Sequence, residues 1–306
     1  MDIQIGYEPP RWTGTADVWS ERVRRSEVFG LDHVAVADHI SFHNRFGADA
    51  LMSAAVILGM SERLRINTGV YLLPLRHPVH VARQVADIAA LYPDRFTFGV
   101  GIGGEDRHEV EISGVDPRTR GRRMDECITI VRALLTGESF DFDGEFFQFE
   151  DVVIGPPPSA PVPIVIGGRS DAALRRAGRV GDGWNGMWIS PKRYAQAIEL
   201  VEETAADAGR TIDRSHHTVT VWCGVGKDAD AARGHVAAQM WDFYQLPFDP
   251  FEKWCPAGSP EQIADFLLPY VEAGATTFNL ALCGPDVATE VLAVAQIRER
   301  MLAALR

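Results

Sequence analysis

An aspartate and a histidine stand side by side at Asp38 and His39, directly after the apolar run 33–37. Histidine titrates near neutral pH, so its imidazole can exchange a proton with a substrate hydroxyl or carbonyl while a hydride moves. The structural alternative is a loop aspartate that caps the next segment beside a solvated histidine. Because the pair follows a predicted strand, we favour His39 as the candidate catalytic acid or base.

A glycine-rich stretch lies at Gly99, Gly101 and Gly104, and its spacing formally matches the dinucleotide-binding fingerprint. A Rossmann turn, however, opens directly onto a helix with an apolar face and has an acidic strand end about twenty residues later. Here a polar run follows at 105–109, and Asp125 falls inside a predicted helix. We interpret the glycines as a loop that lets a planar ring approach the backbone; a glycine-rich turn without a ligand is the alternative.

A second glycine pair, Gly167 and Gly168, precedes Arg169, Ser170 and a predicted helix that starts near Asp171. Free backbone N–H groups at a helix N-terminus bind anions, and the guanidinium adds positive charge. This segment is therefore a candidate phosphate site.

Short apolar runs alternate along the chain with longer segments of helical periodicity. Eight such β-then-α units in one chain favour a (β/α)8 TIM barrel over an open doubly wound sheet. In that barrel the active site lies at the C-terminal ends of the strands, where the residues above are expected. The predicted strands are 3–7, 33–37, 66–72, 96–101, 163–166, 182–186, 218–224 and 277–282, and the main predicted helices are 18–30, 48–60, 79–91, 122–135, 194–208, 231–241, 260–273 and 287–305.

One segment interrupts this alternation. Residues 140–149 alternate at period two around an Asp-Gly turn at 143–144, which predicts a β-hairpin. We expect a single barrel domain over 1–306 with this hairpin inserted near 138–154.

The composition narrows the function classes. The 306 residues are 46% hydrophobic and 24% charged, with a formal net charge of −12. A field of that sign repels phosphate backbones and anionic lipids, so we expect neither a nucleic-acid nor a membrane role. His77 and His80 have ligand-like spacing but no third partner nearby, and the four separated cysteines form no C-x-x-C pair, so we expect no metal and reduced, packed thiols. No signal peptide is apparent, which favours a cytoplasmic protein.

Several blocks together resemble the bacterial luciferase-like oxidoreductases. The resemblance runs from the first predicted strand to about the sixth. The blocks are ADHI at 37–40, GVYLLPLRHP at 69–78, YPDR at 92–95, GVG at 99–101, IVIGG at 164–168 and AGRVGDGW at 177–184.

This resemblance implies a (β/α)8 barrel with insertions, often a homodimer, that holds its coenzyme across the C-terminal ends of the strands. Members similar at Asp38-His39 commonly use the deazaflavin coenzyme F420. Gly69-Val70 corresponds to a bulge after the third strand where members often have a non-prolyl cis peptide. The implied coenzyme contacts are Asp38, Gly69, Val70, Ile102 and Gly103 for the ring system, and Gly167, Gly168, Ser170 and Asp171 for the phosphate tail.

His39 resembles the active-site histidine of the sugar-phosphate dehydrogenases in this family. Those members also carry a catalytic glutamate directly after a threonine-glycine pair, a place that falls on Gly104 here, with Glu105 one position later. This departure argues against a sugar-phosphate substrate.

The leading hypothesis is an F420-dependent oxidoreductase that transfers a hydride between C5 of the deazaflavin and a small organic substrate. A monooxygenase that uses reduced FMN is the alternative on the same fold, and a non-catalytic coenzyme-binding barrel is a second one.

Overall fold

A computed structural model describes residues 2–10, 14–43 and 47–306. Eight parallel strands close into a barrel in the order β1-β10-β9-β8-β7-β4-β3-β2. The barrel strands are β1 (Gln4–Glu8), β2 (His33–Val36), β3 (Arg65–Thr68), β4 (Phe96–Val100), β7 (Ile164–Gly167), β8 (Gly183–Met187), β9 (Thr218–Gly224) and β10 (Thr277–Cys283). The predicted (β/α)8 barrel is therefore confirmed, and all eight expected strands are present.

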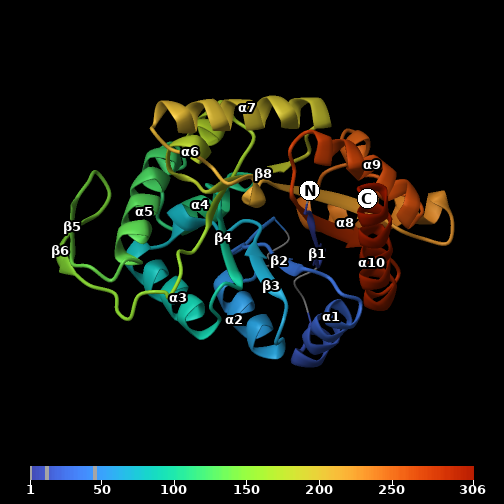
Figure 1. Ribbon diagram of the computed structural model, residues 1–306, viewed down its shortest axis with the longest axis horizontal. Helices are drawn as coiled ribbons and strands as arrows, with labels where there is room; N and C mark the ends of the chain where they lie inside the picture. Colours follow the sequence, from blue (N-terminus) through green and yellow to red (C-terminus); the bar gives the residue numbers. More distant parts are fainter. Residues whose placement is uncertain (1, 11–13, 44–46) are drawn as a thin grey trace.

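Helices pack around the outside of this barrel (Figure 1). Their apolar faces cover the strands, as an amphipathic helix on a fully buried parallel sheet must. The helices are α1 (Ala16–Val28), α2 (Ala50–Met60), α3 (Pro78–Leu91), α4 (Arg107–Ile112), α5 (Arg120–Leu134), α6 (Asp171–Val180), α7 (Pro191–Asp207), α8 (Ala229–Tyr244), α9 (Pro260–Glu272) and α10 (Val287–Ala304).

Local sequence signals explain several helix starts. Ser259 and Gln262 form a reciprocal capping box at the start of α9. Ser190 accepts a hydrogen bond from the backbone N–H of Arg193 and precedes a proline at the first position of α7. Both arrangements satisfy N–H groups that the first helical turn would leave unpaired.

The third strand ends earlier than the sequence indicates. We expected it to continue to Leu72, but β3 ends at Thr68 and the chain then bulges through a cis peptide between Gly69 and Val70. Tyr71 and Leu72 extend the apolar run of the sequence beyond β3 because both side chains are buried, although β3 has already ended. The cis peptide that the family resemblance implied is thus present.

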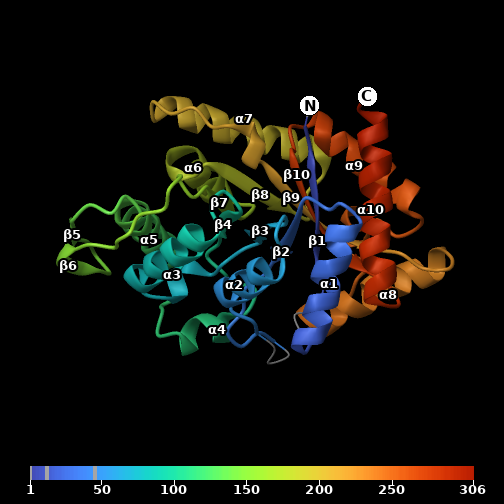
Figure 2. The ribbon, with the colours of Figure 1, turned by 60° about the horizontal axis from the view of Figure 1, so that its bottom comes forward.

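The expected hairpin forms from β5 (Phe140–Asp143) and β6 (Gln148–Val152), with Phe142 paired to Phe149. It projects at the edge of the molecule far from α9 and α10 (Figure 2). Phe147, in the turn of the hairpin, packs against His77 with their ring centroids 5.2 Å apart, so the hairpin contacts the segment just before α3.

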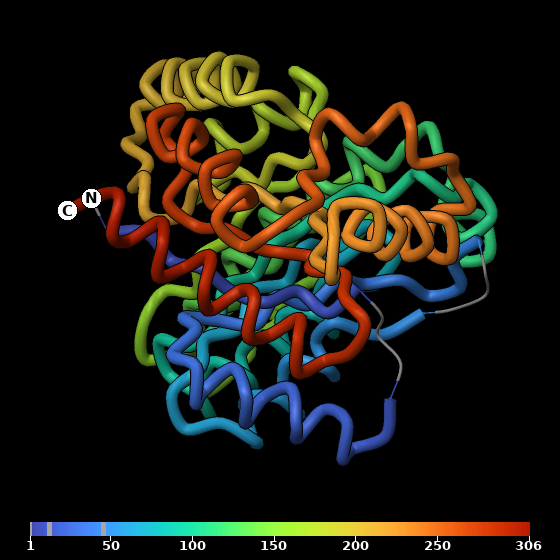
Figure 3. The backbone as a smooth tube through the Cα atoms, turned by 90° about the vertical axis from the view of Figure 1, so that its right-hand side faces the viewer, coloured from blue at the N-terminus to red at the C-terminus, as the bar shows by residue number. Residues whose placement is uncertain are grey.

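The start of the described chain, before β1, and its C-terminal end, after α10, lie side by side (Figure 3). All four cysteines are buried and free, as expected. Within the described ranges, every helix is too short or too polar to cross a bilayer.

Candidate active site

Two cavities lie side by side at the C-terminal ends of the barrel strands. One, with about 580 Å³ of empty volume, is lined by residues that include Glu8, His39 and Phe243. The other, about 720 Å³, is lined by glycines after β4 and β7. They share the lining residues Gly69, Val70, Leu72, Glu105 and Met187, so they adjoin each other, and the two together are called the cleft below.

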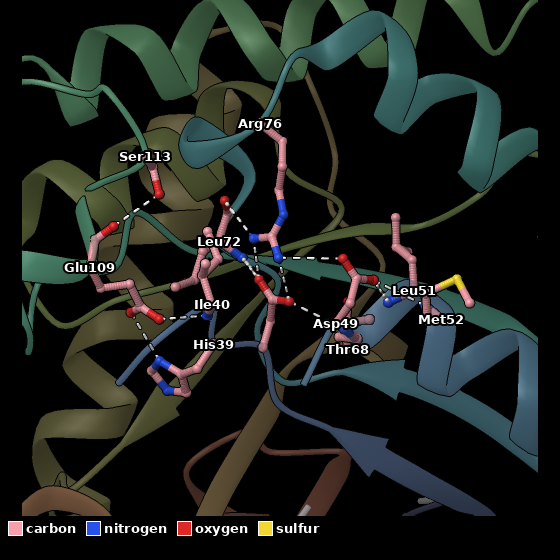
Figure 4. A network of polar contacts seen from close by, with 12 residues as sticks. His39, Ile40, Asp49, Leu51, Met52, Thr68, Leu72, Arg76, Glu109 and Ser113 are labelled. Atoms are coloured by element: carbon pink, nitrogen blue, oxygen red, sulfur yellow. Dashed lines mark hydrogen bonds and ion pairs between the residues drawn. The ribbon is translucent and has the colours of Figure 1, made fainter. Parts of the chain in front are cut away.

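His39 lies in the first cavity and is held by a carboxylate from α4. Its Nδ1 is 3.0 Å from Oε2 of Glu109. The other oxygen, Oε1, accepts a hydrogen bond from the backbone N–H of Ile40 at 2.6 Å (Figure 4). It also accepts one from the backbone N–H of Ser41 at 3.2 Å. The Glu109 side chain is 2% exposed and that of His39 is 15% exposed, so the ring reaches the cleft and its anchor does not.

These contacts determine the charge of Glu109. Burial is the largest single effect and raises its pKa, but the hydrogen bond and charge of His39 and the two backbone N–H groups together outweigh it, so the pKa lies below its ordinary value. Glu109 is thus a carboxylate at neutral pH. A carboxylate on Nδ1 fixes the ring orientation and leaves Nε2 for a ligand.

Asp38 is buried beside His39, at the same end of the barrel. Its carboxylate accepts both terminal guanidinium nitrogens of Arg76, at 2.5 and 2.9 Å, and the backbone N–H groups of Leu72 and Ala50. Figure 4 shows Arg76 between Leu72 and Asp49. Asp38 therefore ties β2, the bulge after β3 and the start of α2 together, and its direct contact with a coenzyme ring stays a prediction.

Val70 lines both cavities. A Cβ built on Gly101 would lie 2.4 Å from Cγ2 of Val70, and one on Gly167 would lie 2.8 Å from Cγ1. Neither position tolerates a side chain without displacing Val70. Ile102 and Gly103 line the second cavity beside Val70, so the expected ring contacts Gly69, Val70, Ile102 and Gly103 are brought together.

The N-terminus of α6 closes the far end of the glycine-lined cavity. Gly167, Gly168 and Arg169 line it, whereas the Ser170 hydroxyl caps the helix by accepting the N–H of Ala173. Asp171 begins α6, as expected, and pairs with Arg193 at 3.1 Å. Anion binding at Ser170 and Asp171 stays a prediction, since the hydroxyl is already used as a cap and the carboxylate is paired.

Aromatic side chains form the outer wall. Phe243 and Tyr244, from the segment after the seventh barrel strand, line the His39 cavity together with Trp222. Trp188 lines the cleft, whereas Trp184 is fully buried and donates a hydrogen bond to the carbonyl of Gly168 at 2.7 Å.

Three residues of the site were not recognised from the sequence. Glu109 stood in a polar run without helical periodicity, and a six-residue helix such as α4 leaves too short a pattern to detect. Arg76 stood inside an apparently apolar motif. Glu8 ends β1, and its place at a strand end was the available signal.

The structure is a closed parallel (β/α)8 barrel with a glycine-lined cavity and an anchored histidine at the C-terminal ends of its strands, where barrels of this kind carry their active sites. The sequence profile of the luciferase-like monooxygenase family matches residues 13–277. This protein therefore belongs to that family.

Individual relatives agree with this membership. An F420-dependent glucose-6-phosphate dehydrogenase of Kribbella flavida is 30% identical, and the alignment covers 94% of each chain. An uncharacterised protein of Mycobacterium tuberculosis is 38% identical over 56% of this chain, a match that spans 59% of that protein's length. A solved F420-dependent secondary alcohol dehydrogenase in complex with an F420-acetone adduct superposes with a TM-score of 0.86 over 98% of this chain and 99% of its own, at 23% identity.

Proposed function

We propose that this protein is an F420-dependent oxidoreductase that transfers a hydride between C5 of the deazaflavin and a small organic substrate. The observation that carries the proposal is the position of His39. Its imidazole, anchored by Glu109, lines a cavity that adjoins the glycine-lined cavity at Val70. Relatives that use F420 and align over most of the chain support the choice of coenzyme.

The residues present fit such a coenzyme. A planar ring needs a surface without projecting side chains, and Gly101, Gly103 and Gly167 provide one beside Val70. An anionic tail needs cationic or N–H donors, and Arg169 with the start of α6 provides them at the other end of the cavity. When bound, F420 supplies the ring carbon that gives or accepts the hydride.

The remaining chemistry belongs to the chain itself. His39 exchanges the proton that leaves or joins the substrate oxygen as the hydride moves. Glu109 keeps the Nδ1 proton in place, so that Nε2 is the nitrogen that faces the substrate. Trp222, Phe243 and Tyr244 exclude water from the reacting face.

Two alternatives remain. A monooxygenase that uses reduced FMN would occupy the same cleft, and the family as a whole carries that description. A non-catalytic coenzyme-binding barrel would bind F420 without converting any substrate.

Deuterium transfer tests the proposal directly. The purified protein is mixed with F420 and a panel of secondary alcohols and sugar phosphates deuterated at the carbinol carbon. We expect bleaching of oxidised F420 with at least one substrate and deuterium at C5 of the product. Oxygen insertion with reduced FMN, in the absence of any deuterium transfer to F420, would establish the monooxygenase instead.

The expected homodimer also stays a proposal. Met52, Val56 and Met60 lie four residues apart on α2 and are 63%, 47% and 36% exposed, so they form an apolar stripe on one helix face. Sedimentation of the wild type and of Val56→Lys tests whether this face joins two copies.

A further inference from the structure

Glu8 is a buried residue at the C-terminal end of β1, and one of its carboxyl oxygens lacks a hydrogen-bond partner among the described residues. It ends β1 and is 5% exposed. Its Oε2 is buried and has no hydrogen-bond partner among the described residues. An unsatisfied buried polar atom costs free energy, so its presence at the mouth of a barrel calls for a ligand that satisfies it.

Asn279, the polar side chain near Glu8, already has hydrogen-bond partners of its own. A Cβ built on Gly69 would lie 3.7 Å from Oε2 of Glu8 and 3.2 Å from Nδ2 of Asn279. Asn279 is itself bonded to His33 at 2.8 Å and to Thr220 at 3.3 Å. Oε2 of Glu8 therefore lies beside the bulge after β3, and no side chain in the described part of the chain pairs with it.

The cavity around Glu8 contains few ionisable groups. His39, Glu105 and Tyr244 line it with Glu8, the charge of Asp38 is neutralised by Arg76, and His33 lies beyond Asn279. Burial raises the pKa of Glu8 to about 8. At neutral pH the group is thus a carboxylic acid with one O–H donor and spare acceptor capacity.

We propose that Glu8 is a specificity-determining residue that donates a hydrogen bond to an uncharged carbonyl or hydroxyl oxygen of the substrate. Glu8 lines the cavity that contains His39 and not the glycine-lined cavity, so its ligand is the substrate rather than the coenzyme. This inference rests on the proposed function.

The consequence is a preference for uncharged substrates. Glu8 is uncharged at neutral pH and Glu105 is an acidic residue, so neither side chain offers a buried anion a compensating positive charge. The aromatic wall of Trp222, Phe243 and Tyr244 suits an apolar body. The site therefore takes an uncharged ketone or secondary alcohol with an apolar group, and it rejects carboxylates and phosphate esters.

The test compares acetophenone with benzoate, which has the same ring but a negative charge. F420 affinity and thermal stability of the wild type, Glu8→Gln and Glu8→Leu are measured first. Failure of the wild type to bind F420 counts against the proposed function, and the probe titrations then follow on the protein without coenzyme. Binding of each probe is measured by calorimetry, and the carbonyl stretch of bound acetophenone by infrared difference spectroscopy.

We expect acetophenone to bind the wild type at least tenfold more tightly than benzoate does. Glu8→Gln, which keeps an N–H donor, should stay within about threefold of the wild type, whereas Glu8→Leu should weaken acetophenone at least tenfold. The carbonyl stretch should move to lower frequency in the wild type and stay at its apolar-solvent position in Glu8→Leu. Equal binding of the two probes, no binding of acetophenone, or an unshifted band in the wild type would overturn the proposal.

Discussion

Nδ1 of His39 and Oε2 of Glu109 lie 3.0 Å apart although 70 positions separate the two residues in the sequence. The contact joins the loop after β2 to the short helix α4. Because Glu109 also accepts the N–H groups of Ile40 and Ser41, one carboxylate fixes both the imidazole and the backbone that carries it. This arrangement is typical of a histidine whose orientation matters for chemistry.

Replacing Glu109 with Gln should slow turnover while coenzyme binding is retained. The amide keeps an acceptor for the backbone of the loop but loses the charge opposite Nδ1 of His39. A hydrogen bond to a charged group contributes about 1.5–3 kcal/mol, so we expect kcat to fall roughly 10- to 100-fold. Glu111→Gln, an exposed glutamate on the same helix that pairs with Arg107, is the matched control. Equal kcat values for the two variants would show that Glu109 does not contribute to turnover.

His39→Asn should have a larger effect on the same step. It keeps some hydrogen bonding but removes the titrating group, and loss of a general acid or base costs about a hundredfold to ten-thousandfold in rate. We expect kcat to fall in that range, measured with the substrate found in the deuterium-transfer screen, while the Kd of F420 changes little. His108→Asn, an exposed histidine on α4, should behave as the wild type. A folded His39→Asn enzyme with normal turnover would show that another group moves the proton.

The sequence predicted the barrel because each strand and helix carries its own local signal. Eight apolar runs, capping serines such as Ser259 and an Asp-Gly hairpin turn are readable within a few residues. The position of His39 at the barrel mouth follows from the fold alone, since strand ends carry the active site.

Contacts between distant segments could not be predicted in this way. The partner of His39 comes from α4, and the partner of Asp38 comes from the loop before α3. Neither Glu109 nor Arg76 differs locally from a surface charge, and only the folded chain shows that both are turned inward. Glu8 is similar: its significance lies in the missing partner, which no sequence pattern records.

Arg169 should contribute to coenzyme affinity through charge. Its guanidinium stacks over Trp188 at 5.5 Å and lines the glycine-lined cavity at the start of α6. We expect Arg169→Ala to weaken F420 binding about threefold to tenfold and to reduce the salt dependence of Kd. Arg175→Ala, which removes an exposed arginine from the same helix, is the control. Identical salt dependence in both variants would place the phosphate tail elsewhere on the barrel mouth.

The stability of the wild type should depend on pH through Glu8. Burial raises its pKa from 4.5 to about 8 in the folded protein, so between these values the folded state binds more protons than the unfolded state. The contribution of Glu8 to stability is therefore greatest below pH 4.5 and is lost as the pH rises toward 8. Urea unfolding of the wild type and of Glu8→Gln across this range should show the wild type losing stability relative to the variant. Parallel curves would mean that Glu8 is ionised in the folded protein.

Relative affinity for the two coenzymes tests the central claim most directly. Purified protein is titrated with F420 and with FMN under the same conditions, with the fluorescence of each ring as the signal. We predict that F420 binds at least tenfold more tightly, a difference of about 1.4 kcal/mol. Equal affinities, or tighter binding of FMN, would contradict the assignment of this protein as an F420-dependent oxidoreductase.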